Sequence, residues 1–570
     1  MRGVLGCVFV GAGLLLAPRP LSAVLVFVVC LIACGISAAV LLILQSRSGP
    51  WRWAFAVALT ASAIVAALFI PAVVLVLPGV LAAALIAIAV RLLVRATAKG
   101  CTAALRVAHA FSAAACLLFA ALVWIWPDVA TIALGAAFAL AFLGLGVVLL
   151  VRAIRAPAGL SARGAGRRRP VLRAIGAALV LAAAVAATGG SLQLRAGIAE
   201  PDDFYIWDAE VPAVPGTVLR TAPYEGELPE GAAAVRVLYA TTHSDDSPAL
   251  ASAVIAYPRA SATSSRPVLA WQHGTTGVAR SCGPSVGPAA LTEYAIPGIS
   301  RAIERGWVVV ATDYPGQGTA GRYPYLIGQG EARATLDSIR AAQQIRDAAA
   351  SDSAWIWGHS QGGHATLWAG RIAPEYAPEI DVVGVAALSA ASDPLTLAER
   401  ITGATASALG KVVTSLVLVP YAEEYPDVDL GASVHPAGHG IVRAFASRCV
   451  AERPTLISVL MAASLSADAP LYRIDVSAGA THDRLAENVA DGLVPAPLFL
   501  GQGVEDEVIP IEMQRTLSAR LCEAGRTVQT REYEGRSHMG VIAEDSPLID
   551  DLYAWADLVA EGVQPRNCPE

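Results

Sequence analysis

The sequence predicts two structural parts: an all-α bundle of about six or seven membrane-spanning helices, followed by a soluble α/β domain with a mainly parallel sheet. Residues 1 to about 195 are almost wholly apolar, whereas the remainder carries acidic residues, prolines and glycines throughout. In that second part strand-like and helix-like segments alternate, which is typical of an α/β domain. The formal net charge of the 570 residues is −6, and no cationic face is visible, so we expect no nucleic-acid partner.

Apolar runs fill the first part. They lie at roughly 3–17, 21–44, 53–70, 72–93, 103–125, 129–151 and 171–190. Several reach the ~20 residues that cross a ~30 Å hydrocarbon core, and a cleavable signal peptide would explain only one of them. A soluble protein does not bury so many apolar helices in succession. We therefore expect an integral membrane domain over residues 1–155, then a basic linker and a last membrane helix within 156–195.

The charged loops of this part alternate from one side to the other. The turns near 18–20, 71 and 126–128 carry one positive charge between them, whereas the loops on the other side collect the remaining arginines and lysines. By the positive-inside rule the basic loops and the N-terminus are cytoplasmic. Seven crossings then place everything after about residue 195 outside the cell membrane.

The membrane part also shows a weak internal repeat. Proline-marked outer turns alternate with basic loops, from Pro20 to Arg47, from Pro71 to Arg91 and from Pro127 to Arg152. Trp126-Pro127-Asp128 followed by Gly144-Leu145-Gly146 resembles the repeat of HdeD-like acid-resistance membrane proteins, which have three helical hairpins. The resemblance covers about residues 1–155. Because charges within the apolar runs are nearly absent, we interpret this bundle as an anchor or partner module.

The second part contains the segment Gly358-His359-Ser360-Gln361-Gly362 between a strand-like run, Ala354–Trp357, and a helical run that extends to Ile372. Strand, Gly-x-Ser-x-Gly and helix together are typical of the nucleophile elbow of the α/β-hydrolase fold. Small residues are needed on both sides because the serine backbone is strained, and the helix dipole favours a developing oxyanion. A buried serine in a glycine turn is the alternative. The context instead predicts Ser360 as a nucleophile.

A serine nucleophile needs a base, and the base needs a carboxylate that orients it. In this fold the acid and the histidine follow the serine in that order. Asp506 lies after the strand-like run Pro497–Leu500, and His538 lies after another, Thr527–Tyr533. We therefore predict the catalytic triad Ser360, Asp506 and His538.

Some neighbouring residues compete for these roles. Glu505 and Glu507 adjoin Asp506, and Asp393, on the loop after Val382–Leu388, is a positional rival for the orienting acid. His359 and His364 flank the serine, and we expect them to pack or to line the pocket.

The spacing of His435 and His439 could suggest a metal site. The proline and glycine between them argue against a helix that would align them, and no third ligand stands nearby in the sequence. We expect neither a metal nor a cofactor.

The oxyanion of an acyl-transfer intermediate needs two hydrogen-bond donors. One should be the backbone N–H of Gln361, the residue after the nucleophile. The other should come from the His273–Thr276 loop, which follows an early strand, with Thr275 as the best candidate. A plain glycine turn is the alternative for this loop.

Further motifs appear in a fixed order along the soluble part: Asp313-Tyr314-Pro315-Gly316-Gln317-Gly318, Tyr323-Pro324-Tyr325, Glu331-Ala332-Arg333, Gly358–Thr366 and Ala373–Pro378. Over about residues 205–568 the chain thereby resembles microbial secretory lipases of the lipase A type. The resemblance implies a serine esterase or lipase without a metal, the same triad, and a helical cap at about Pro394–Asn488. Members of that family are typically secreted, whereas this chain carries a membrane part.

Cysteines agree with an extracytoplasmic location. The soluble part has four, Cys282, Cys449, Cys522 and Cys568, an even number as expected for disulfides. Three pairings are possible from the sequence. The resemblance implies Cys282–Cys449 and Cys522–Cys568, which would clamp the cap and the C-terminal tail.

Together these features predict a membrane-anchored extracytoplasmic esterase or lipase, with residues 196–570 as the hydrolase domain. Its substrate would be a lipid-like carboxylic ester, cleaved through an acyl-enzyme. Acyl transfer to an envelope alcohol or sugar would use the same triad. A third hypothesis is a membrane stress or scaffold protein with an inactive hydrolase domain.

Overall fold

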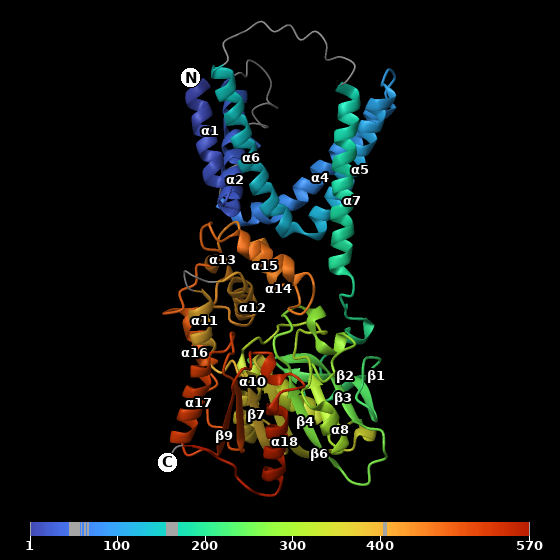
Figure 1. The fold of residues 1–570 in the computed structure, drawn as a ribbon, viewed down its shortest axis with the longest axis vertical. Coiled ribbons are helices and arrows are strands. Elements are labelled where there is room, and N and C mark those ends of the chain that lie inside the picture. The colour runs from blue at the N-terminus through green and yellow to red at the C-terminus, as the bar shows by residue number, and fades with distance from the viewer. Residues whose placement is uncertain are drawn as a thin grey trace.

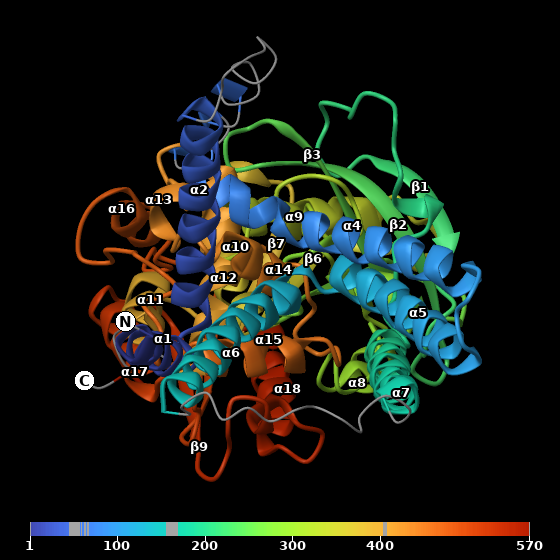
Figure 2. The same ribbon diagram turned by 90° about the horizontal axis from the view of Figure 1, so that it is seen from above.

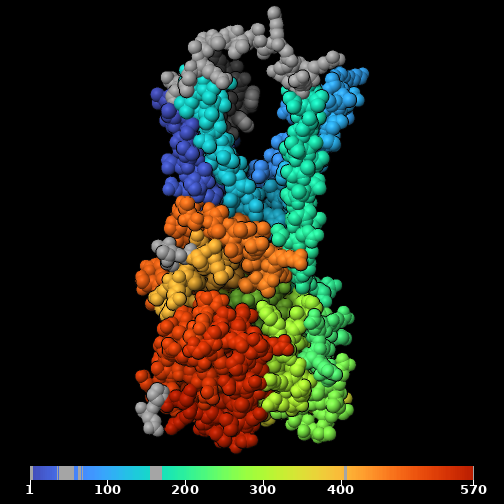
Figure 3. Space-filling view, viewed as in Figure 1, coloured from blue at the N-terminus to red at the C-terminus, as the bar shows by residue number. Residues whose placement is uncertain are grey.

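The computed structural model describes residues 2–44, 68–154, 169–402 and 407–568, with isolated positions between 57 and 66. The molecule is elongated, with a helical bundle at one end and an α/β domain at the other (Figure 1). The helices of the cap lie between the two, as the space-filling view also shows (Figure 3).

Long apolar helices make up the bundle. They are α1 (Arg2–Leu16), α2 (Pro20–Leu44), α4 (Ile70–Thr97), α5 (Ala103–Ile125), α6 (Pro127–Ile154) and α7 (Arg169–Arg195). Among the described residues, four helices (α4, α5, α6 and α7) are long and apolar enough to cross a membrane, whereas the apolar stretches Val4–Leu16 and Pro20–Cys34 are shorter. The predicted run at 53–70 lies mostly outside the described residues.

The ends of the bundle differ in charge. The turn between α1 and α2, the turn between α5 and α6, and the end of α7 lie toward the α/β domain (Figure 1). The turn between α4 and α5, with Arg95 and Lys99, lies at the far end, as does the N-terminus. The basic turn between α4 and α5 is therefore at the end remote from the α/β domain.

Helix packing in the bundle follows the chain order only for α4 and α5 among the major helix pairs. Helix α1 packs along α6, α4 along α5, and α5 along α7. The chain reverses at the predicted proline-marked turns beside Pro20 and Pro127, but the helices joined at those turns diverge (Figures 1 and 2). Gly13 and Gly146 allow the close approach of α1 and α6, since a Cβ atom on either would lie within 2.7 Å of the partner backbone.

The α/β domain is built on one sheet. Within residues 169–402 and 407–568, nine strands form it in the order β1-β2-β3-β5-β4-β6-β7-β8-β9. Their bounds are β1 Val218–Pro223, β2 Ala232–Thr242, β3 Pro248–Pro258, β4 Arg266–Gln272, β5 Val308–Thr312, β6 Ala350–His359, β7 Asp381–Leu388, β8 Leu498–Gly503 and β9 Val528–Tyr533. From β5 through β9 the neighbours pair parallel, and the pairs β1–β2, β2–β3 and β3–β5 are antiparallel. The predicted α/β-hydrolase fold is confirmed.

Helices cover both faces of the sheet. On one face lie α9 (Gly328–Gln343), α10 (Gln361–Tyr376) and α17 (Ile511–Glu523), and on the other lie α8 (Ile299–Glu304) and α18 (Pro547–Ala560). Central strands are consequently buried on both sides, and their sequences are continuous apolar runs, as in Val308-Val309-Val310 of β5.

The cap consists of short helices within the range expected for it. They are α11 (Pro394–Thr402), α12 (Ala408–Glu424), α13 (Leu430–Ser433), α14 (His439–Ala446), α15 (Thr455–Ser464) and α16 (Ala480–Glu487). Their apolar side chains form one buried cluster with Leu21 and Val24 of α2 and Val74 and Leu77 of α4. The cap and the bundle therefore share a hydrophobic core.

Two disulfides tie the domain together. Cys282 is bonded to Cys449, 167 residues away, and joins the loop after β4 to the cap. Cys522 is bonded to Cys568, 46 residues away, and joins α17 to the C-terminal tail. These are the pairs that the resemblance implies.

The turn from β6 into α10 depends on glycine. A Cβ atom on Gly362 would lie 1.9 Å from the carbonyl oxygen of Gln272, and one on Gly358 would lie 2.3 Å from the carbonyl oxygen of Gly362. These neighbours are backbone atoms that cannot turn aside. The missing side chains let α10 start directly over the carboxyl end of β4.

We expect Gly362→Ala to lower the free energy of unfolding by at least about 2 kcal/mol, because the added methyl group overlaps backbone. Gly287→Ala is the matched control, since its Cβ atom would meet only one atom, at 3.9 Å. Denaturant unfolding of the full chain in detergent, followed by tryptophan fluorescence, measures both. Equal stability of the two variants would contradict this packing.

The disulfides can be checked by mass mapping of peptides from the unreduced protein. We expect linked peptides for Cys282 with Cys449 and for Cys522 with Cys568, each of which disappears on reduction. Crossed pairs would refute the arrangement, and four free thiols would also argue against an extracytoplasmic location.

Candidate active site

Ser360 occupies the turn between β6 and α10. Its backbone has φ 59° and ψ −117°, a conformation that a residue with a side chain adopts only when its surroundings impose it. The Ser360 N–H donates to the carbonyl oxygen of Leu388 at 2.9 Å, and its carbonyl oxygen accepts from the N–H of Ala391 at 3.1 Å. Two hydrogen bonds to the segment after β7 thus hold the strained turn.

The hydroxyl of Ser360 is the first member of a chain of hydrogen-bonded side chains. Its Oγ lies 2.9 Å from Nε2 of His538, and Nδ1 of the same ring lies 2.8 Å from Oδ2 of Asp506. When Nδ1–H donates to the carboxylate, Nε2 carries the lone pair and can accept the serine proton. His538 therefore lies within hydrogen-bond distance of both other residues that the sequence predicted as a triad.

Asp506 is fixed by donors on both oxygens. Oδ1 accepts from the backbone N–H groups of Val508 at 2.9 Å and Ile509 at 2.8 Å. Oδ2 also accepts from Nε2 of Gln502 at 3.0 Å. Burial raises the pKa of this carboxyl, but the hydrogen bond and the charge of His538, together with the two backbone N–H groups, outweigh burial and leave the pKa below its usual value. The carboxylate is therefore ionised at neutral pH.

The neighbouring acids make other contacts. Glu507 accepts from the backbone N–H of His538 at 3.1 Å. Asp393, the positional rival for the orienting acid, instead accepts from the N–H of Thr396 at 2.9 Å and from its hydroxyl at 2.8 Å. Asp393 thus serves the first turn of α11 and not the imidazole.

Both histidines beside the serine have structural partners. His359 Nε2 donates to the carbonyl oxygen of His538 at 3.0 Å. Burial, with a smaller effect of neighbouring His538, lowers the pKa of His359 to about 3, so its ring is neutral and holds the His538 backbone in place. In His364, Nδ1 faces a carboxylate oxygen of Glu331 at 2.7 Å, and Nε2 donates to the carbonyl oxygen of Asn488 at 2.7 Å.

The predicted oxyanion loop lies against the nucleophile. A Cβ atom on Gly274 would be 3.5 Å from Cβ of Ser360. Thr275 Oγ1 lies 2.9 Å from the hydroxyl of Tyr325, a contact that fixes the loop. Gln361 is the first residue of α10, so its N–H has no acceptor within the helix. Both backbone segments expected to supply donors are consequently beside Ser360.

Sequence reasoning gave no individual roles to Asp313 and Gln317, although the motif that holds them was recognised. Gln317 Nε2 donates to Oγ1 of Thr276 at 2.9 Å and to the carbonyl oxygen of Gly277 at 2.7 Å. Asp313 is buried and accepts from the hydroxyl of Ser252 at 2.5 Å. Burial raises the pKa of Asp313 to about 6, against the opposing effect of its hydrogen bonds. Gln317 therefore braces the loop after β4, and Asp313 ties the segment after β5 to β3.

Known proteins resemble the α/β domain in sequence. Residues 287–550 match the family model of the secretory lipases. A probable inactive lipase of Mycobacterium tuberculosis is 28% identical over 395 residues, which cover 65% of this chain and 86% of that protein. Lipase A of Moesziomyces aphidis is 26% identical over 423 residues, which cover 69% of this chain and 87% of that protein.

Solved structures share the fold. Candida antarctica lipase A in its closed state superposes with a TM-score of 0.53 at 20% identity, over 64% of this chain and 87% of that chain. The motifs, the fold and the matched residues all fall in the α/β domain. Residues 287–550 thus match the secretory lipases, and the whole α/β domain is similar to lipase A-like α/β-hydrolases.

Proposed function

We propose that this chain is a membrane-anchored extracytoplasmic serine hydrolase that cleaves lipid-like carboxylic esters. The observation that carries the proposal is the hydrogen-bonded series from Ser360 through His538 to Asp506. Kinship with lipases supports an ester as the substrate class. That family relationship alone does not assign activity, because one relative is described as a probable inactive lipase.

In the proposed reaction Ser360 Oγ attacks the acyl carbonyl carbon, and its proton passes to Nε2 of His538. Asp506 holds the imidazole in the required tautomer and stabilises the imidazolium. The backbone N–H groups of Gln361 and the Thr275 loop would bind the oxyanion of the tetrahedral intermediate. His538 then gives its proton to the departing alcohol, and water releases the acyl group by the same steps.

The proposed location rests on charge and on disulfides. The basic turn between α4 and α5 lies at the end of the bundle remote from the α/β domain, which favours a cytoplasmic N-terminus and an α/β domain on the outside. The two disulfides of that domain are typical of an oxidising compartment. The kinship of residues 1–155 with HdeD-like proteins stays a prediction.

The Ser360 and His538 side chains are nearly covered. Each residue is 7% exposed, which leaves little open surface at the two side chains. We infer that the structure is a closed state and that substrate entry involves cap movement.

We expect Ser360→Ala to abolish hydrolysis of p-nitrophenyl esters by the full chain in detergent, while the unfolding temperature stays within a few degrees of the parent. Initial rates and a thermal melt measure the two effects. An undiminished rate of ester hydrolysis in the variant would contradict the assignment of Ser360 as the nucleophile. A parent chain that hydrolyses no ester of any acyl length would favour the inactive-domain reading. Added alcohol acceptors distinguish transfer from hydrolysis by their ester products.

Asp506→Asn should lower kcat by about three to four orders of magnitude, because an amide in place of the carboxylate favours the wrong imidazole tautomer. Asp393→Asn is the matched control and should leave kcat unchanged, since Asp393 contacts only the start of α11. Steady-state kinetics on both variants give the comparison. A large loss in Asp393→Asn with none in Asp506→Asn would transfer the role to Asp393.

A further inference from the structure

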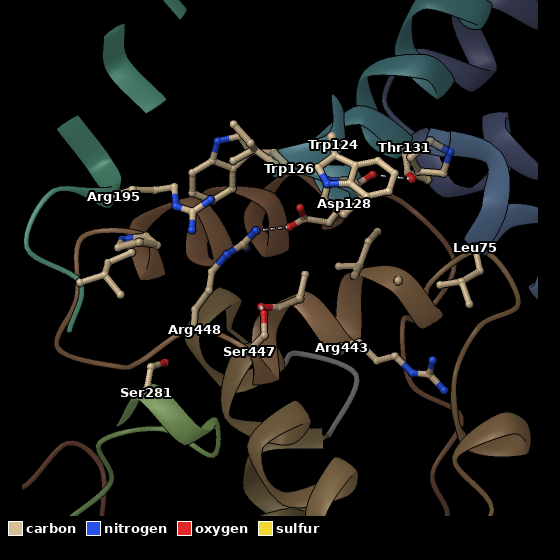
Figure 4. Close-up of a pocket in the computed structure, with 18 of the residues that line it drawn as sticks. Leu75, Trp124, Trp126, Asp128, Thr131, Arg195, Ser281, Arg443, Ser447 and Arg448 are labelled. Atoms are coloured by element: carbon tan, nitrogen blue, oxygen red, sulfur yellow. Dashed lines mark hydrogen bonds and ion pairs between the residues drawn. The ribbon is translucent and has the colours of Figure 1, made fainter. Parts of the chain in front are cut away.

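A cavity of about 550 Å³ lies where the bundle meets the cap. It is bounded by α4, by the turn between α5 and α6, by the end of α7, and by α14 of the cap. Figure 4 shows side chains from bundle and cap facing one another across it. We call it the junction cavity.

One wall of the junction cavity holds a buried ion pair between the two parts of the molecule. Oδ2 of Asp128, at the start of α6, accepts from Nη2 of Arg448 in the cap at 2.6 Å. The guanidinium of Arg448 also lies 5.0 Å from the ring centroid of Trp126, and its Nη1 donates to Ser458 at 2.9 Å. Arg448 is thus held in one position beside the cavity.

The second oxygen of Asp128 has no such partner. Asp128 is 1% exposed, and within the described residues its Oδ1 makes no hydrogen bond. A buried carboxylate oxygen without a donor is unfavourable. Because Asp128 lines the cavity, a ligand there could supply the missing N–H or O–H donor.

Charges of both signs line the cavity. Arg195 and Arg443 line the cavity and form no ion pair with the described residues, and the acids Glu200 and Glu452 also line it. With the pair Asp128–Arg448, the lining carries as many carboxylates as guanidinium groups. A complementary ligand would therefore combine an anionic group with a hydrogen-bond donor.

Other parts of the lining of the junction cavity are apolar. Val74, Leu75 and Pro78 of α4 line it, together with Trp124 at the end of α5. Leu75 is 47% and Trp124 79% exposed on the surface of the bundle, where a membrane-spanning helix would meet acyl chains. The cavity thus joins a charged interior to an apolar surface, which suits an amphiphile better than a free polar solute.

We propose that the junction cavity binds one phospholipid of the outer leaflet whose headgroup carries an N–H or O–H donor. The donor lies at Oδ1 of Asp128, the phosphate lies near one of the two unpaired arginines, and the acyl chains follow α4. This site is separate from Ser360, and the proposal rests on the membrane location given under the proposed function.

The junction cavity is also connected to the segment beside the nucleophile. Ser281 lines the cavity and precedes Cys282, which is bonded to Cys449 of the cap. The N–H of Val450 donates to the carbonyl oxygen of Thr276 at 2.8 Å, in the loop that lies against Ser360. A lipid in this position would therefore contact the junction of cap and oxyanion loop.

The test uses the full chain carrying Ser360→Ala, so that no bound ester is hydrolysed and the outcome does not depend on catalysis. Native mass spectrometry in detergent counts retained lipid after incubation with palmitoyl-oleoyl phosphatidylethanolamine, phosphatidylglycerol or phosphatidylcholine. Phosphatidylcholine has the same phosphate and chains but no headgroup donor. We expect at least about tenfold weaker retention of phosphatidylcholine, because it cannot form the hydrogen bond to a charged acceptor.

Cavity-filling variants locate the bound lipid. Ala444→Trp, on α14 within the lining, should abolish the preference for phosphatidylethanolamine and phosphatidylglycerol over phosphatidylcholine. Ser447→Trp should do the same if the Ala444→Trp variant does not fold. Leu460→Trp is the control, because Leu460 is 57% exposed on α15 and does not line the cavity. Equal retention of all three lipids overturns the proposal, as does a preference that persists in both cavity variants. A chain soluble without detergent would instead refute the membrane location.

Discussion

The α/β domain depends on holding the imidazole of His538 in one position. This ring must meet Ser360 on one side and Asp506 on the other, although these residues lie 178 and 32 positions away along the chain. Parallel strands bring the three loops to one edge of the sheet, since each loop follows the carboxyl end of its strand. The neutral His359 ring and the Glu507 carboxylate then fix the His538 backbone from two directions. The geometry of one side chain is thus maintained by the whole domain.

Much of this arrangement could be predicted from the sequence because it depends on local patterns. The elbow motif, the chain order of the triad and the apolar runs of the central strands are all short-range signals. Strand β1 was not expected, since Val218–Pro223 is a partly exposed edge strand with no clear apolar alternation. The bracing by Asp313 and Gln317 was also missed, because their partners lie on segments far away in the sequence.

The contacts between the bundle and the cap could not be predicted from the sequence either, because the residues that make them are far apart in the chain. Asp128 is 320 residues from Arg448, and in the sequence it reads only as part of a turn. Asp468 of the cap accepts from the backbone N–H groups of Leu21 at 2.6 Å and Ser22 at 3.2 Å, at the start of α2. A cap residue thereby satisfies the free N–H groups of a bundle helix. The cap is therefore fastened to the helical bundle as well as to the α/β domain.

The most direct measurement of the central claim is covalent labelling of the full chain with a fluorophosphonate, followed by peptide mapping. We expect one adduct, on the peptide that contains Ser360, and much slower labelling when Asp506 is replaced by Asn, because the serine is nucleophilic only with its oriented base. An adduct on another residue, or the absence of any adduct on a folded chain, would contradict it.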